Sequence, residues 1–126
     1  MKRLHEQQAE QVARAAGVTP LPPGDDEYLH VSFAAIEAHS ILGVRREDEG
    51  QPFTGWEIIS IAEDVETAKF GYFSTIELEA VRPEWMMALA LPAGWSFRFE
   101  GTTLVHCMNP AGVTIPMQLA AFGNSP

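Results

Sequence analysis

The chain has 126 residues, of which 46% are hydrophobic and one is cysteine, and its formal net charge is −9. This length fits one ordinary domain, and the apolar content is that of a globular chain rather than a disordered one. A lone cysteine excludes an internal disulfide and fits a reducing compartment. The sequence also lacks a run of about 20 apolar residues that could span a membrane. We therefore expect a soluble, cytoplasmic protein that is not bound to a membrane.

The acidic charge is concentrated in one part of the chain. Segment 25–66 contains eleven acids and two arginines, whereas acids and bases are equal in number elsewhere. A field of one sign speeds association with a partner of the opposite sign. It disfavours direct contact with nucleic acid, whose phosphates prefer lysine and arginine. We predict a partner with a basic surface and no direct binding of nucleic acid, with a purely solubilising role as the alternative.

The first predicted element is a helix over residues 2–16, which lack glycine and proline and carry a thin apolar stripe at helical spacing. Gly17 ends this helix, and the proline-rich residues 18–24 follow as a stiff connector. We divide the chain into an N-terminal helix, 1–17, and a single α+β domain, 18–126. Because the stripe is thin, we expect the helix to pack loosely on the body or on a second copy in a homodimer.

Strands and turns alternate after the connector. The run 28–33 predicts a strand, and 34–39 predicts one or two helical turns. Segments 41–44 and 56–61, rich in β-branched residues, predict a hairpin whose long polar loop contains three consecutive acids. The run 76–81 alternates with a period of two, but it is also compatible with a helix.

A short helix and an aromatic hairpin complete the predicted fold. Pro83 suits the first position of a helix, and Pro92 ends it. Residues 95–100 place three aromatic side chains on one face of a strand that pairs with 103–108. We expect an α+β fold with a mostly antiparallel sheet of four to six strands, on which the N-terminal helix and the Pro83 helix pack.

The histidines and the cysteine do not form a recognisable catalytic or metal-binding pattern. His106 and Cys107 are adjacent, so their side chains point to opposite faces of a strand. The other histidines have no cysteine or histidine partner at metal-ligand spacing. We predict that the protein is not an enzyme and holds no metal or cofactor, and that Cys107 is a buried core residue.

The acidic loops are the predicted binding surface. Loops on a rigid scaffold often carry binding function. Acids there would steer a cationic partner, and a nearby aromatic side chain would supply contact area. The predicted partner-binding residues are Asp25, Asp26, Glu27, Glu47, Asp48, Glu49, Phe53, Trp56, Glu63 and Asp64.

Several short motifs between residues 31 and 99 resemble a bacterial immunity family. They are Val31-Ser32, the strand 41–47 with its Arg-Glu end, the Gly-Trp strand 54–60, the proline-containing helix 82–89, and the small-Gly strand 91–99. The pattern is similar to the thirty-third immunity class of the polymorphic-toxin systems. The resemblance implies a protein that occludes a cognate toxin and has no catalytic residues. The alternative is a small enzyme or ligand-binding domain with a pocket between the sheet and the Pro83 helix.

Overall fold

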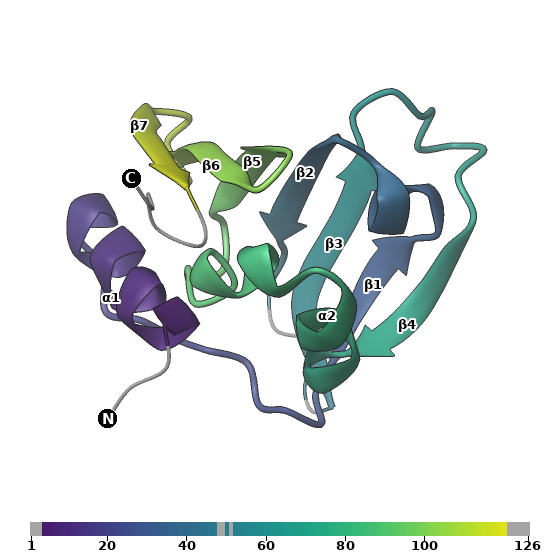
Figure 1. Cartoon of the computed structure of the whole chain (residues 1–126), viewed down its shortest axis with the longest axis horizontal. Helices are drawn as coiled ribbons and strands as arrows, with labels where there is room; N and C mark the ends of the chain where they lie inside the picture. The colour runs from purple at the N-terminus through teal and green to yellow at the C-terminus, as the bar shows by residue number, and fades with distance from the viewer. Residues whose placement is uncertain (1–3, 48–49, 51, 121–126) are drawn as a thin grey trace.

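The computed structural model describes residues 4–47, 50 and 52–120. Its centre is a seven-stranded sheet in the order β4-β1-β3-β2-β5-β6-β7 (Figure 1). Neighbouring strands are antiparallel except β1 and β3, which run parallel. The elements are α1 (Leu4–Ala16), β1 (Tyr28–Ser32), η1 (Ala34–Glu37), β2 (Ser40–Arg45), β3 (Phe53–Ser60), β4 (Phe70–Ser74), α2 (Thr75–Val81), η2 (Pro83–Met87), β5 (Ser96–Glu100), β6 (Thr103–Met108) and β7 (Thr114–Ala120).

The α+β class is confirmed, but the sheet is larger than the four to six strands expected. The additional strand, β7, lies in the tail, where Pro116 argues against a strand because proline lacks the N–H that a ladder needs. In the described part of the chain, β7 is the last strand of the sheet and pairs with β6 alone. At such an edge, a proline can direct its missing donor away from the neighbouring strand, so the tail completes the sheet.

The ambiguous run 76–81 forms the helix α2, and a capping box explains why. The Ser74 backbone N–H donates to Glu77 Oε1 at 2.8 Å, and the Glu77 N–H donates to Ser74 Oγ at 3.2 Å. This reciprocal pair satisfies two amides that would otherwise lack partners at the start of the helix. The segment that begins at Pro83 is also helical, as expected, but it is a 3₁₀ helix, η2.

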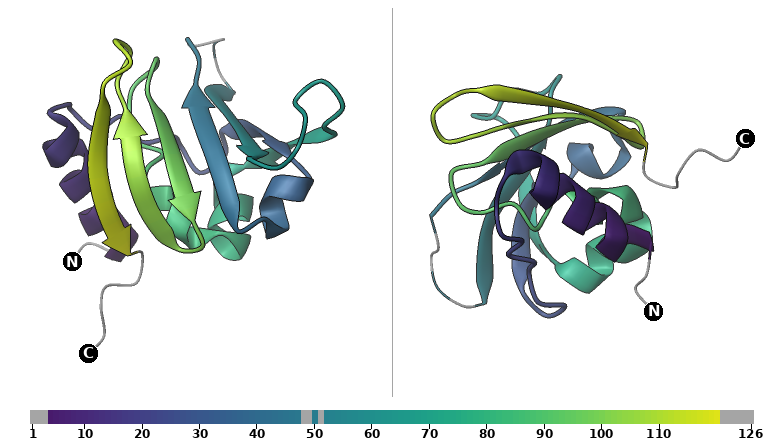
Figure 2. Two further views of the ribbon diagram at one scale, coloured as in Figure 1. Left: turned by 90° about the horizontal axis from the view of Figure 1, so that it is seen from above. Right: turned by 90° about the vertical axis from the view of Figure 1, so that its left-hand side faces the viewer.

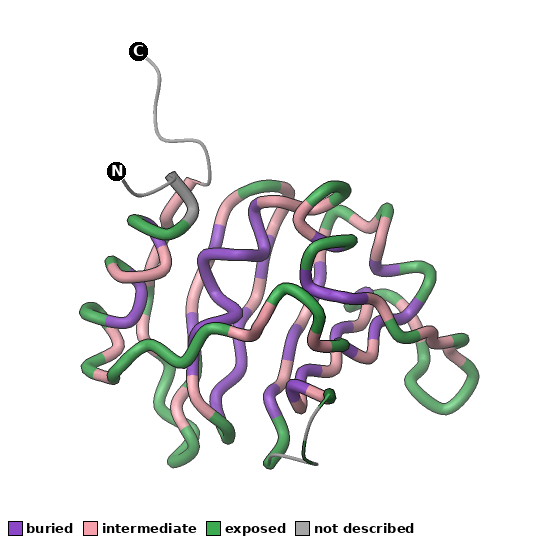
Figure 3. The backbone as a smooth tube through the Cα atoms, turned by 90° about the horizontal axis from the view of Figure 1, so that it is seen from below, coloured by how far each residue is buried: buried purple, intermediate pink, exposed green. Residues whose placement is uncertain are grey.

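One core lies between the sheet and the helices α1, α2 and η2. Figure 2 shows α1 and the α2–η2 segment together on one side of the sheet, and Figure 3 shows buried residues alternating along the strands. Strand β3 alternates perfectly between half-buried and buried positions. The largest fully buried side chains are Trp56, Trp85, Phe97, Phe99, Leu29, Ile41, Ile58, Leu78, Met87, Leu89, Leu91 and Leu104.

Helix α1 is part of this core. Val12 and Ala13 are 1% and 2% exposed, and the Gln8 side-chain amide donates to the Ala120 carbonyl at 2.9 Å. Residues of α1 therefore contact both η2 and the end of β7. The thin apolar stripe is covered within the chain, so the packing is tighter than the sequence indicates. Within the described ranges, no helix has the length and apolar character needed to cross a membrane.

A buried arginine joins three separate segments at one end of the sheet. Arg45 is 8% exposed and ends β2. Its guanidinium donates to the carbonyls of Leu21, Leu89 and Leu91 at 2.9, 3.2 and 2.9 Å, and its Nε donates to Thr54 O at 3.0 Å. The connector, the segment after η2 and strand β3 are thus held together by one side chain. These hydrogen bonds fix the end of the sheet from which the β2–β3 loop extends.

Candidate functional site

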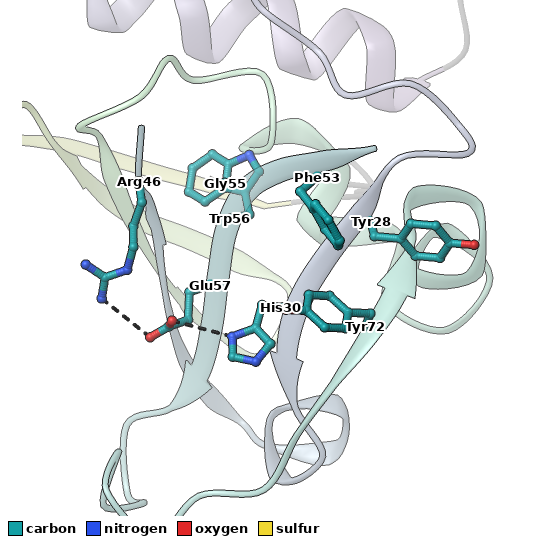
Figure 4. Close-up of a pocket in the computed structure, with 8 residues that line it drawn as sticks. All are labelled: Tyr28, His30, Arg46, Phe53, Gly55, Trp56, Glu57 and Tyr72. Atoms are coloured by element: carbon teal, nitrogen blue, oxygen red, sulfur yellow. Dashed lines mark ion pairs between the residues drawn. The ribbon is translucent and has the colours of Figure 1, made fainter. Parts of the chain in front are cut away.

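The face of the sheet opposite the helices carries the candidate site. Strands β1, β3 and β4 and the residue after β2 surround a hollow of about 210 Å³ there (Figure 4). Such a volume is below the roughly 300–1,000 Å³ of typical small-molecule pockets. The hollow is lined by Tyr28, His30, Arg46, Phe53, Gly55, Trp56, Glu57 and Tyr72.

A glycine between two outward-facing side chains of β3 lines the hollow. Phe53, Gly55 and Glu57 alternate along β3 with its buried residues, so all three belong to the open face. Gly55 has φ +89°, and a Cβ at this position would lie 2.5 Å from the Arg46 carbonyl oxygen. Only glycine fits this close approach of β2 to β3. The absence of a side chain here leaves space between the ring of Phe53 and the carboxylate of Glu57.

Aromatic rings form one wall of the hollow. His30 stacks on Phe70 with a centroid distance of 4.4 Å, and its ring lies 5.1 Å from that of Tyr72. The Tyr72 ring lies 5.2 Å from that of Phe53. Tyr72 is 60% exposed, although it contacts two rings. The wall therefore presents an accessible ring at the surface of the sheet.

A carboxylate with two loose partners lies beside this wall. Glu57 Oε2 is 3.5 Å from His30 Nδ1, and Glu57 Oε1 is 3.5 Å from Arg46 Nη2. Both distances exceed the roughly 2.7–2.9 Å of a short charge-assisted hydrogen bond. The side chain of Arg46 is 62% exposed, whereas that of Glu57 is 24% exposed. Glu57 therefore retains accepting capacity toward a further donor.

The acids of segment 25–66 do not form a single patch. Residues 25–27 precede β1, and the Tyr28 N–H donates to the Pro52 carbonyl at 2.7 Å, so these acids lie at the same end of the sheet as the β2–β3 loop. Glu47 also lies at this end. Residues 63 and 64 follow β3 and lie at the opposite end, separated by a strand of roughly 26 Å. Asp48 and Glu49 lie outside the described residues.

Three of the predicted binding acids support the local backbone. Glu63 Oε2 accepts hydrogen bonds from the Ser32 hydroxyl and, at 2.7 Å, from the Ser60 N–H. Glu27 Oε1 accepts from the Gly24 N–H at 2.6 Å, and Asp64 Oδ1 accepts from the Glu66 N–H at 2.9 Å. The exposed acids at the end of the sheet nearest the β2–β3 loop are Asp25, Asp26 and Glu47, and Asp25 lines a separate hollow beside α1 and α2.

The two predicted aromatic residues have different surroundings. Phe53 lines the hollow, in agreement with its predicted place near the acidic loop. The Trp56 indole cannot supply exposed contact area, because it is 1% exposed and donates to the Leu89 carbonyl at 2.9 Å. Adjacent residues of β3 point to opposite faces of the sheet, so Trp56 points to the core, away from the open face that Phe53 occupies.

Six lining residues were not predicted from the sequence: Tyr28, His30, Arg46, Gly55, Glu57 and Tyr72. The alternation of β3 is a signal that could have placed position 57 beside position 53. The contribution of β1 and β4 depends on strand order, which the local pattern does not contain. The parallel pairing of β1 with β3 and the antiparallel pairing of β1 with β4 bring the tyrosines and the histidine to this site.

Among the described residues, no group of three or more histidine, cysteine, aspartate or glutamate side chains could hold a metal ion. The predicted burial of Cys107 is confirmed, since its exposed fraction is 0%. The space between the sheet and η2 is occupied by core side chains, and a hollow of about 140 Å³ beside η2 faces α1 and the connector instead.

The fold and the hollow define a small α+β domain with an open sheet face. The model of the Imm33-like domain matches residues 7–109, which is most of the chain, so the protein belongs to the Imm33-like family. The match extends beyond the motifs found in the sequence, because it includes most of α1 and all of β6. Searches of curated proteins and of solved structures found no match.

Proposed function

We propose that this protein is an immunity protein that binds a cognate toxin and neutralises it by occlusion in the cytoplasm of the cell that makes both. Membership of the Imm33-like family supports this function. Occlusion needs an accessible rigid surface and no catalysis. The observation that carries the proposal is the open face of the sheet, which has a hollow lined by Arg46 and Glu57 and exposed acids at one end.

The proposed interface is the end of the open face nearest the β2–β3 loop. Asp25, Asp26 and Glu47 would steer a basic toxin surface toward this end, and Phe53 and Tyr72 would supply aromatic contact area. A toxin that acts on nucleic acid has a basic surface of this kind, because its own substrate is a polyanion. Glu27, Glu63 and Asp64 would contribute to the field while they support their own loops.

Binding to the polypeptide encoded beside the gene for this chain tests the function. We expect the two proteins to co-purify and the toxin to lose activity at a one-to-one ratio in vitro. Cells that lack this chain should be killed by that toxin and rescued by its expression. Failure to bind, or tolerance of the toxin without this chain, would contradict the proposal.

Association kinetics test the contribution of the acids. We expect the double reversal Asp25→Lys and Glu47→Lys, measured at physiological salt, to slow association far more than it accelerates dissociation. The matched control is Glu37→Lys with Glu66→Lys, which changes the net charge equally with exposed acids at the opposite end of the sheet. At physiological salt, charges are screened within about 8 Å, so the control pair should have little effect. Equal effects of both reversals would show that net charge alone determines the rate.

A further inference from the structure

We infer that the hollow on the open face is a socket for one guanidinium side chain, an arginine of the partner protein. The inference rests on the proposed function, because it names the chemical group that the toxin inserts. A volume of about 210 Å³ suits one side chain better than a whole metabolite. The Glu57 carboxylate and the Tyr72 ring lie on either side of the His30 ring, and all three line the hollow (Figure 4).

Two features of the socket match the two faces of a guanidinium. A planar cation is attracted to the face of an aromatic ring, and Tyr72 offers an exposed ring. A carboxylate accepts two parallel N–H donors from the edge of a guanidinium. Glu57 provides this group, and its two contacts at 3.5 Å are long enough to leave room for shorter bonds.

The chain itself already places a guanidinium against this carboxylate. Arg46 reaches Glu57 from the side and remains 62% exposed. This side chain occupies the edge of the socket only loosely, so it would compete with an incoming arginine. The neighbouring Arg45 does not compete, because its guanidinium is bonded to interior carbonyls. We therefore expect removal of Arg46 to increase the affinity of the socket for an arginine side chain.

Charge complementarity selects a cation over an anion. The sequence neighbours of the lining residues are acidic, since Glu27 precedes Tyr28 and Glu47 follows Arg46. Asp25 and Asp26 lie at the same end of the sheet. An anion would gain from Arg46 but would meet this acidic field and the Glu57 carboxylate. A cation gains from the field and, once Arg46 is displaced, from the carboxylate as well.

The first experiment uses a small probe and needs no toxin. The full chain is titrated with acetyl-arginine-amide, and with the uncharged acetyl-citrulline-amide as control, while amide NMR shifts are recorded. We expect saturable shifts concentrated at Gly55, Glu57 and Tyr72 with the arginine probe only. The Glu57→Gln variant should lose them, and Arg46→Ala should bind the probe several-fold more tightly.

Matched variants distinguish a socket from general charge attraction. Glu100 is also a half-exposed carboxylate on a central strand, bonded to Arg98 at 2.8 Å, so Glu100→Gln and Arg98→Ala should leave probe binding unchanged. Shifts spread over the acids at both ends of the sheet, or shifts that persist in Glu57→Gln, would overturn the inference. Weaker binding of the probe to Arg46→Ala would also overturn it.

The second experiment uses the toxin encoded beside this chain. We expect Tyr72→Ala and Glu57→Gln each to weaken toxin binding about 30-fold, as interface hot spots do. The control for Tyr72 is Phe33→Ala, since Phe33 is 56% exposed and contacts Phe73 away from the hollow. If the toxin binds these variants and wild type equally, the socket is refuted while the immunity function stands. If wild type does not bind the toxin, the proposed function fails, and the NMR titration alone decides on the socket.

Discussion

Replacement of Arg45 by alanine should be among the most destabilising single changes in this chain. Its side chain is 8% exposed and donates four hydrogen bonds to backbone carbonyls. Three of these bonds, to Thr54, Leu89 and Leu91, are buried, whereas the bond to Leu21 is partly buried. In the variant, water can replace the lost donor at the Leu21 carbonyl more readily than at the three buried carbonyls.

The magnitude follows from the three buried bonds. A hydrogen bond with a charged donor contributes about 1.5 kcal/mol at the low end of its range. The Leu89 carbonyl would keep the Trp56 indole as a donor, so we add no further penalty for unpaired carbonyls. We therefore expect Arg45→Ala to lower the free energy of unfolding by about 4–5 kcal/mol. Arg45→Lys keeps the charge but loses the planar fork of donors, so its loss should be intermediate.

Urea unfolding followed by tryptophan fluorescence measures this loss, because Trp56, Trp85 and Trp95 are all buried. The control is Arg46→Ala, which removes the adjacent arginine with a 62% exposed side chain. That variant should change stability by less than about 0.5 kcal/mol. A loss below about 1 kcal/mol for Arg45→Ala, with an unchanged slope against urea, would refute the reasoning. If Arg45→Ala does not fold, the comparison of Arg45→Lys with Arg46→Ala still provides the test.

Three other predictions concern the core, a helix cap and the cysteine. Gly43→Ala should cost about 1–3 kcal/mol in urea unfolding, because the new Cβ would lie 2.4 Å from the Phe97 ring; an unchanged midpoint would show that the ring moves freely. Ser74→Ala should cost about 1 kcal/mol through loss of the cap, as measured by the same assay. The Ser74 backbone N–H and hydroxyl also hold the pKa of Glu77 below its usual value of 4.5, so this contribution to stability is complete above that value and is lost as pH falls through the lower folded-state pKa. An NMR titration of Glu77 should show its pKa rising in Ser74→Ala, and an unchanged value would contradict the cap. Burial raises the pKa of Cys107 to about 12, so a thiol reagent at pH 8 should label the protein only after unfolding; fast labelling of the native protein would place the thiol at the surface.

Local sequence patterns predicted much of the fold. The hairpin of β5 and β6 was identified from its aromatic alternation, and Phe97 and Phe99 are fully buried as that alternation requires. The end of the first helix before Gly17 and the start of a helix at Pro83 were also predicted correctly. These features depend on neighbours within a few residues, where backbone preference and side-chain periodicity act directly.

The features that the sequence did not predict depend on contacts between residues that are far apart in the chain. Pro116 argues against a strand in the tail, and the β-branched run 113–115 before it is too short to outweigh that signal, whereas in the fold β7 pairs with β6. Burial of Arg45 depends on carbonyls supplied by the connector and by the segment after η2. The predicted acidic residues likewise lie at two opposite ends of the sheet, because the eight residues of β3 separate the acids before this strand from those after it.

The regular alternation of β3 has an evolutionary consequence. Trp56 and Ile58 are buried in the core, whereas Phe53 and Glu57 are half-buried on the other face. Under the proposed function, selection can change the outer set to follow a changing toxin while the inner set is retained. Variation within the family should concentrate at these outward positions, and the scaffold should tolerate it with little loss of stability. Alternate positions of one strand can thus carry a variable recognition surface and a conserved interior.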